Sequence, residues 1–117
     1  MRNDRENKID IKRNRTPDIK ICNNWNNCNY SHKCDTHSMS PTFECNDILK
    51  GYKPYSDELK IGDIILFKTP KNGLFTHRII GIDNNAYITK GDNNLDIDPF
   101  RVKYGDILAK VVEIEYH

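Results

Sequence analysis

The chain has 117 residues and a formal net charge of +1. This length allows one small domain, because a chain of this size buries only about two-thirds of its unfolded surface. The near-neutral charge gives no reason to expect nucleic acid as a partner, no apolar run approaches the roughly 18–20 residues of a membrane helix, and no apolar segment follows the charged N-terminus as in a secretory signal. As the sequence stands, we expect a soluble, cytoplasmic protein.

Residues 1–35 differ from the rest of the chain in composition. They are rich in Asn, Lys and Arg and poor in aliphatic residues, and Pro17 interrupts any helix in this region. Acidic residues are mixed among the basic ones, which favours a solvated segment over a polybasic binding patch. We predict a poorly ordered, Cys- and Asn-rich N-terminal arm over residues 1–35, followed by a single domain over residues 36–117.

The four cysteines are Cys22, Cys28, Cys34 and Cys45. Their spacing does not match the paired C-x2-C motifs of common zinc sites. With His32 and His37 nearby, a metal site is one interpretation and a pair of disulfides is another. We favour reduced, unlinked thiols, as is usual in the cytosol, and predict no metal and no cofactor.

From residue 38 onward, short apolar runs alternate with turn residues. The runs are rich in Ile, Val, Phe and Tyr, and they span residues 47–51, 63–68, 74–82, 86–90 and 107–116. Repeated short strands of this kind indicate an all-β barrel or sandwich. The segments 71–73 and 83–85 carry the Asn and Gly residues that hairpin turns need.

Ser38 is the candidate nucleophile. It lies in Ser38-Met39-Ser40-Pro41, a segment that proline stiffens. A nucleophilic serine needs hydrogen-bond donors for the oxyanion of the tetrahedral intermediate. The Ser38 N–H can be one donor. The Thr36 hydroxyl can be the second, because residues i and i−2 of an extended segment point to one side.

His77 is the candidate general base. It lies in the predicted strand 74–82, where alternation places Phe75, His77 and Ile79 on one face. A neutral imidazole there can accept the Ser38 proton. His37 is the rival base, but as the neighbour of Ser38 on an extended segment it should point away from the hydroxyl.

The acidic partner of His77 comes from Asp92, Asp96 or Asp98. Asp92 follows Gly91 in a predicted tight turn, and Asp98 is constrained because it precedes a proline. We interpret Asp96 as a solvated turn residue. Lys68 and Lys90 are the bases that a Ser–Lys dyad would use, and both are interpreted as solvated strand lysines.

Four segments together resemble the conserved boxes of type I signal peptidases of the endoplasmic-reticulum and archaeal subtype. Residues 38–42 resemble the nucleophile box, and residues 61–68 resemble the structural box. Residues 76–82 resemble the box that holds the histidine base, and residues 89–98 resemble the acidic box. Residues 106–112 also resemble the last strand of the family. The resemblance covers residues 36–116, most of the chain.

The resemblance implies the β-rich barrel-sandwich fold that signal peptidases share with LexA-type self-cleaving repressors. It also implies endopeptidase cleavage after small residues, in an Ala-x-Ala setting. Ser38 takes the role of nucleophile and His77 that of base. Asp98 takes the essential acidic role, with Asp92 assisting, and Thr36 stands where the family often has an oxyanion-hole serine.

Two departures from the family pattern are informative. The apolar anchoring helix that normally precedes the nucleophile box is replaced by a polar segment with cysteines, and His37 replaces the small residue before the serine. If the protein acts as the family does, it must associate with the membrane by another route, such as a membrane-anchored partner.

We therefore expect a serine endopeptidase whose partner is a peptide or protein precursor. A soluble maturation peptidase acting on one partner is a variant of this hypothesis. The alternative from a different class is a catalytically silent module of the same fold that binds or regulates a partner and holds a metal through its cysteines.

Overall fold

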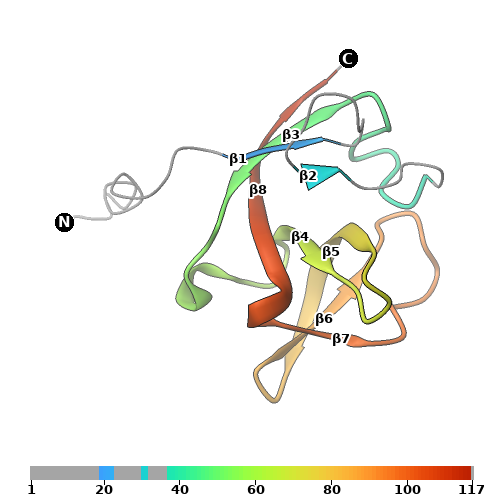
Figure 1. The fold of residues 1–117 in the computed structure, drawn as a ribbon. Helices are drawn as coiled ribbons and strands as arrows, with labels where there is room; N and C mark the ends of the chain where they lie inside the picture. Colours follow the sequence, from blue (N-terminus) through green and yellow to red (C-terminus); the bar gives the residue numbers. More distant parts are fainter. Residues whose placement is uncertain (1–18, 23–29, 32–36, 117) are drawn as a thin grey trace.

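The computed structural model of the chain describes residues 19–22, 30–31 and 37–116. It confirms the all-β class, with eight strands in one sheet in the order β2-β1-β3-β8-β4-β5-β6-β7 (Figure 1). The strands are β1 (Ile19–Cys22), β2 (Tyr30–Ser31), β3 (Ile48–Tyr52), β4 (Ile64–Lys68), β5 (Leu74–Asp83), β6 (Ala86–Lys90), β7 (Arg101–Lys103) and β8 (Ile107–Glu115). Across these three ranges, no helix is long and apolar enough to span a bilayer.

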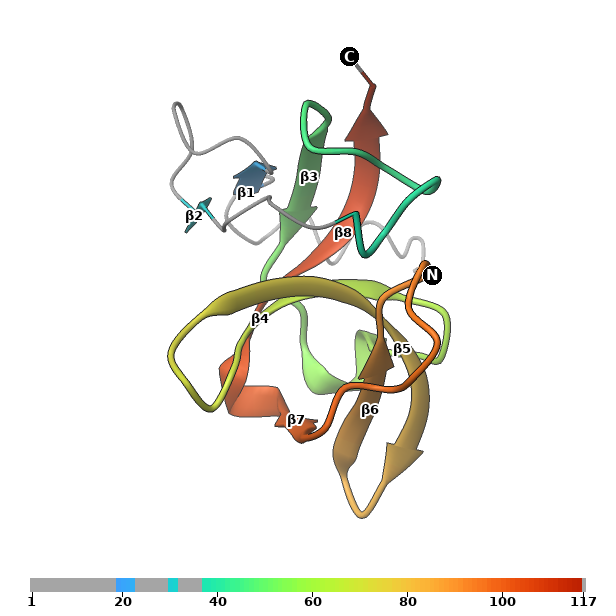
Figure 2. The ribbon, with the colours of Figure 1, turned by 90° about the vertical axis from the view of Figure 1, so that its right-hand side faces the viewer.

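The long strand β8 joins the two halves of the sheet. It pairs with β3 on one side and with β4 on the other, both antiparallel, and runs the height of the molecule in Figure 1. Register shifts interrupt the β3–β8, β4–β8 and β5–β6 ladders. Because a bulge bends a strand and increases its twist, these irregularities curve the sheet, and Figure 2 shows β4 and β5 crossing beneath β3 and β8.

The five strands predicted from the sequence are all present, and no end differs from its predicted position by more than one residue. The short strand β7 and two 3-10 helices, η2 (Ser56–Glu58) and η3 (Tyr104–Asp106), were not predicted. A three-residue strand has too few residues for an alternating pattern to be recognised.

Two strands lie within the segment that we predicted to be a poorly ordered arm. β1 pairs antiparallel with β3, and β2 pairs parallel with β1, so parts of the arm extend the sheet. The rest of the arm, including the predicted boundary at residue 36, lies outside the described residues.

Both predicted hairpin turns are confirmed. Asn72 lies between β4 and β5 with a φ of 65°, and Asn84 and Asn85 join β5 to β6 with φ of 52° and 66°. Asparagine tolerates this left-handed region better than most residues with a Cβ. The turns thereby set the register of the two hairpins around β5.

Strand β4 lies between two core clusters. Ile64 and Leu66 point into the first core cluster, and Ile65 and Phe67 point into the second. The other members of the first cluster are Met39, Phe43, Leu49 and Ala109, and those of the second are Leu59, Ile79, Tyr87, Val102 and Ile107. Alternation along a strand sends successive side chains to opposite faces, so an unbroken apolar run is what a strand buried on both faces requires.

We expect Ile65→Ala to lower the free energy of unfolding by about 2–5 kcal/mol, because it leaves a cavity in the second core cluster. Ile65 is fully buried, whereas Ile82 is 50% exposed. The matched change Ile82→Ala should cost less than about 0.5 kcal/mol. Urea unfolding of both variants tests this, and equal losses would contradict the assigned core.

Candidate active site

Ser38 lies in a compact turn that follows directly on residue 37. The Ser40 N–H donates to His37 O (3.1 Å), and the Thr42 N–H donates to Met39 O (2.8 Å). The Ser40–Pro41 peptide bond is cis. The prediction that Ser38 belongs to an extended segment is therefore wrong, since proline and these turn hydrogen bonds bend the chain here. Thr36, the predicted second oxyanion donor, lies outside the described residues.

Two apolar side chains that follow Ser38 attach this turn, which we call the nucleophile turn (residues 38–42), to the protein interior. Met39 is 3% exposed and the following Phe43 is 5% exposed, and both belong to the first core cluster. Ser38 itself is half-buried. The apolar anchors leave the serine hydroxyl at the surface of the core, where it can meet groups from β5.

His77 comes from β5, which lies between β4 and β6. Its Nε2 is 3.1 Å from Ser38 Oγ, within hydrogen-bond distance. The imidazole is almost fully buried, with 5% of the residue exposed. The structure thus brings together the two residues that the sequence analysis proposed as nucleophile and base.

Asp98 is the carboxylate behind the imidazole. Its Oδ2 is 2.8 Å from His77 Nδ1 and also accepts a hydrogen bond from the Thr89 hydroxyl (2.7 Å). The Asp98 N–H donates to Thr89 O (2.8 Å), which ties the β6–β7 loop back to β6. Since a carboxylate only accepts hydrogen bonds, Nδ1 carries the ring proton and Nε2 of the neutral imidazole is left to accept the Ser38 proton.

Asp92, the other candidate acid, pairs with Arg78 instead of His77. The guanidinium donates from Nε to Oδ1 (2.8 Å) and from Nη2 to Oδ2 (2.7 Å), a bidentate pair. The Thr42 hydroxyl also donates to Asp92 Oδ2 (2.5 Å). The hydrogen bonds from Arg78 lower the pKa of Asp92, and the carboxylate in turn raises the pKa of Arg78.

His77 and Arg78 therefore serve two different sites from adjacent positions in β5. His77 points toward Asp98, and Arg78 points toward Asp92 on the other face of the strand. Asp92 and Thr42 connect β5 to the nucleophile turn, so the salt bridge helps to place Ser38 relative to His77.

Aromatic rings surround the imidazole. The centroids of Phe75 and Phe67 lie 4.9 Å and 6.3 Å from that of His77, and Phe100 lies 6.0 Å from Phe75. The predicted common face of Phe75, His77 and Ile79 is consistent with these contacts and with the burial of Ile79.

The residues that we set aside lie apart from this arrangement. His37 is exposed and its Nδ1 is 3.5 Å from Glu44 Oε1. Lys68 and Asp96 are exposed, as expected for solvated residues. Lys90 donates to its neighbour Gly91 O (3.2 Å).

The cysteine prediction is wrong for Cys45, which is disulfide-bonded. We expected reduced thiols because we expected a cytosolic protein. The side chains of Cys22, Cys28 and Cys34 lie outside the described residues. Residues 37–116 contain no cluster of three or more His, Cys, Asp or Glu side chains that could hold a metal ion.

Four residues with direct contacts to the site were missed by the sequence analysis. Thr89 binds Asp98, and Arg78 and Thr42 bind Asp92. Asn93 donates its N–H to Ser38 O (2.7 Å) and its Nδ2 to His37 O (3.0 Å). Each lies inside a segment that the analysis singled out. The only signal in the sequence was that these residues lie close to a candidate residue. Their hydrogen-bond partners lie far away along the chain, so the sequence does not show which groups they contact.

Comparison with known proteins identified no relative. No family model matches the chain, and no curated protein or solved structure is significantly similar to it. The function must therefore be argued from the arrangement of Ser38, His77 and Asp98.

We expect Asp92→Asn to reduce the dependence of stability on acidic pH. A carboxyl whose pKa is lowered by folding stabilises the protein above its unfolded pKa, about 3.9, and that contribution is lost as the pH falls through the folded value. The variant should be less stable than wild type at pH 7 and should lose less stability between pH 5 and pH 2.

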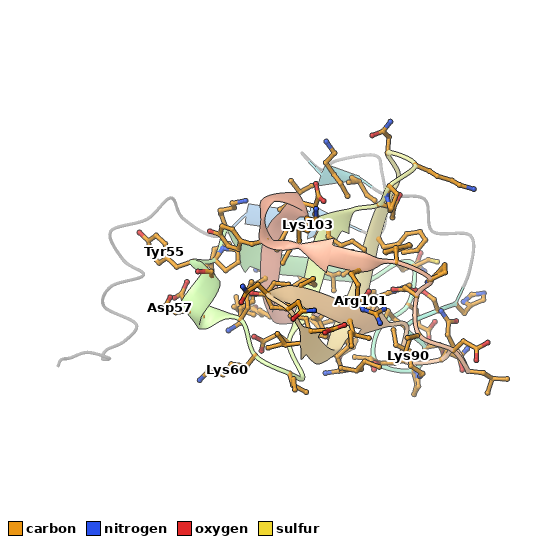
Figure 3. The ribbon with its side chains drawn as sticks, turned by 90° about the horizontal axis from the view of Figure 1, so that it is seen from below. Tyr55, Asp57, Lys60, Lys90, Arg101 and Lys103 are labelled. Atoms are coloured by element: carbon orange, nitrogen blue, oxygen red, sulfur yellow. The ribbon has the colours of Figure 1, made fainter. Side chains whose placement is uncertain are left out.

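Asp57→Asn is the control for the change in formal charge. Figure 3 shows Asp57 on the η2 side of the molecule, far across the view from Lys90. Urea unfolding as a function of pH measures both variants. If Asp92→Asn and Asp57→Asn gave the same pH profile, the Arg78 pair would not contribute as described.

We also expect Gly91→Ala to destabilise the protein by about 1–3 kcal/mol through overpacking. A Cβ at Gly91 would lie 2.8 Å from Ser38 O and 2.6 Å from Asn94 Nδ2. The backbone of the nucleophile turn would have to shift. Gly105→Ala is the matched control, because a Cβ there meets nothing within 4 Å. Thermal unfolding of the two variants tests this, and similar melting temperatures would contradict the close approach.

Proposed function

We propose that this chain is a serine endopeptidase of the signal-peptidase type. The observation that carries the proposal is the continuous series of contacts from Ser38 Oγ to His77 Nε2 (3.1 Å) and from His77 Nδ1 to Asp98 Oδ2 (2.8 Å). A nucleophile, a base and an orienting carboxylate within hydrogen-bond reach are the geometric requirements for acyl transfer by a serine.

In the proposed reaction, Ser38 Oγ attacks the scissile carbonyl carbon while its proton passes to His77 Nε2. Asp98 stabilises the imidazolium and remains ionised. The oxyanion of the tetrahedral intermediate is held by the Ser38 N–H, with the Thr36 hydroxyl as the expected second donor. The imidazolium returns the proton to the leaving amine, and water then hydrolyses the acyl-enzyme by the same steps.

The resemblance of the four sequence segments to signal-peptidase boxes supports a more specific proposal. The substrate is a precursor with small residues at the cleavage site, in an Ala-x-Ala setting, and the specific fold is the barrel-sandwich of signal peptidases and LexA-type proteases. The strand-rich sheet and the geometry at Ser38 agree with this kinship. Within it, Asp98 takes the essential acidic role and Asp92 assists by holding the nucleophile turn.

The proposal also includes where cleavage occurs. A signal peptide presents its cleavage site at a bilayer surface, and a membrane-anchored partner would place this chain there. A maturation peptidase of the same type, acting on a soluble precursor, would not need one. Co-sedimentation of the protein with membranes from its own cells separates the two.

We expect Ser38→Ala and His77→Ala each to lower kcat/KM for an Ala-x-Ala peptide by at least about 10³-fold, because members of a catalytic triad act as a unit. Both variants should remain folded. Ser56→Ala, on the distant η2, controls for the loss of a hydroxyl, and His37→Ala tests the rival base; both should retain most activity.

A fluorophosphonate probe gives a second measurement, since it labels only an activated serine. It should label wild-type Ser38 and fail to label His77→Ala. Wild-type protein that neither cleaves the peptide nor reacts with the probe would favour the catalytically silent module. Normal cleavage by His77→Ala would refute the mechanism.

A further inference from the structure

The loop between β6 and β7 approaches the backbone on both sides of the candidate nucleophile. The Asn93 N–H donates to Ser38 O (2.7 Å), and the Asn93 side-chain Nδ2 donates to His37 O (3.0 Å). One residue thus holds the carbonyls of the two consecutive peptide groups that Ser38 shares with its neighbours. Figures 1 and 2 both show this loop, in orange, directly below the nucleophile turn, in teal.

The contact with His37 O determines the direction of the Ser38 N–H. A trans peptide group is planar, so its C=O and N–H point in opposite directions. Because the His37 C=O is directed at Asn93 Nδ2, the Ser38 N–H is directed away from the β6–β7 loop. The Ser40 N–H also donates to His37 O (3.1 Å), so two donors on one carbonyl restrict rotation of this peptide group.

We propose that the Asn93 side chain is a positioning residue that orients the Ser38 N–H for the oxyanion. This inference rests on the proposed function. Asn93 touches neither Ser38 Oγ nor the His77 ring, and acts through the His37–Ser38 peptide group. An oxyanion donor must lie 2.7–3.1 Å from the position where charge develops, so a modest rotation of that peptide group weakens the stabilisation while the Ser38–His77 hydrogen bond is kept.

This role differs measurably from a purely structural one. Oxyanion contacts strengthen only as the tetrahedral intermediate forms, so their loss lowers kcat and leaves KM nearly unchanged. A variant that merely loosened the loop would lower stability and weaken substrate binding as well. A fall in kcat with an unchanged KM therefore indicates the positioning role.

The decisive variant is Asn93→Asp. It matches asparagine in shape and keeps the backbone N–H that donates to Ser38 O, but it replaces the side-chain donor with a carboxylate facing the His37 carbonyl. Asn94→Asp is the matched control for the added charge in the same loop. The Asn94 backbone N–H donates to Gly91 O (2.9 Å), a contact within the loop and not with the nucleophile turn. Asn93→Ala removes the donor without adding charge.

With an Ala-x-Ala peptide, Asn93→Asp and Asn93→Ala should each lower kcat by about tenfold or more, the scale of a weakened oxyanion donor, with KM changed by less than about twofold. Asn94→Asp should match wild type. A peptide boronic acid ending in Ala supplies a second measurement. Ser38 Oγ adds to the trigonal boron of the inhibitor and passes the hydroxyl proton to His77, which gives a tetrahedral boronate anion. Because this anion needs the same donor as the tetrahedral intermediate, the inhibition constant of the boronic acid should rise by the same factor as kcat falls.

Each other outcome overturns a defined part of the argument. An active wild type with unchanged kcat in Asn93→Asp and Asn93→Ala would overturn the role of Asn93 and leave the proposed function intact. If urea unfolding showed that both variants fail to fold, Asn93 would be a structural residue, and the positioning role would also be overturned. A wild type that neither cleaves the peptide nor binds the boronic acid would overturn the proposed function and this inference together.

Discussion

The buried hydrogen bond between His77 and Asp98 is the contact around which the rest of the structure is arranged. Both residues are 5% exposed, and a buried carboxylate is costly unless its oxygens are paired. Asp98 meets that requirement with the His77 ring and the Thr89 hydroxyl. The β5–β6 register, in which Ile79 lies opposite Thr89, supplies the second of these partners. A shift of the register by one residue would turn Thr89 to the other face.

A second set of contacts holds the nucleophile against this buried pair. The Arg78–Asp92 salt bridge joins β5 to the β6–β7 loop, and the Thr42 hydroxyl and the backbone of Asn93 join that loop to the nucleophile turn. These groups are more exposed than the His77–Asp98 pair. The loop therefore has two roles, since Asp92 and Asn93 place Ser38 and Asp98 places the imidazole. The short loop segment of residues 91–98 therefore sets the geometry of the whole candidate site.

Much of this arrangement could be anticipated from local sequence. The strands around His77 and the Asn-containing turns follow from period-two alternation and from the tolerance of asparagine for positive φ, both of which act over a few residues. The nucleophile, base and acid were proposed from their types and settings. The extended conformation predicted at Ser38 was wrong because turn hydrogen bonds compete with extension there. The disulfide at Cys45 was missed because thiol pairing depends on distance in the fold.

The sequence by itself determined the all-β class, the positions of the principal strands and the small set of residues from which the proposed site was assembled. Only the tertiary structure decided which aspartate meets the imidazole. Asp92 and Asp98 both follow β6 closely and carry the same carboxylate, so local pattern cannot separate them. Their roles diverge because adjacent residues of β5 point to opposite faces of the sheet, where Arg78 captures Asp92 and His77 captures Asp98.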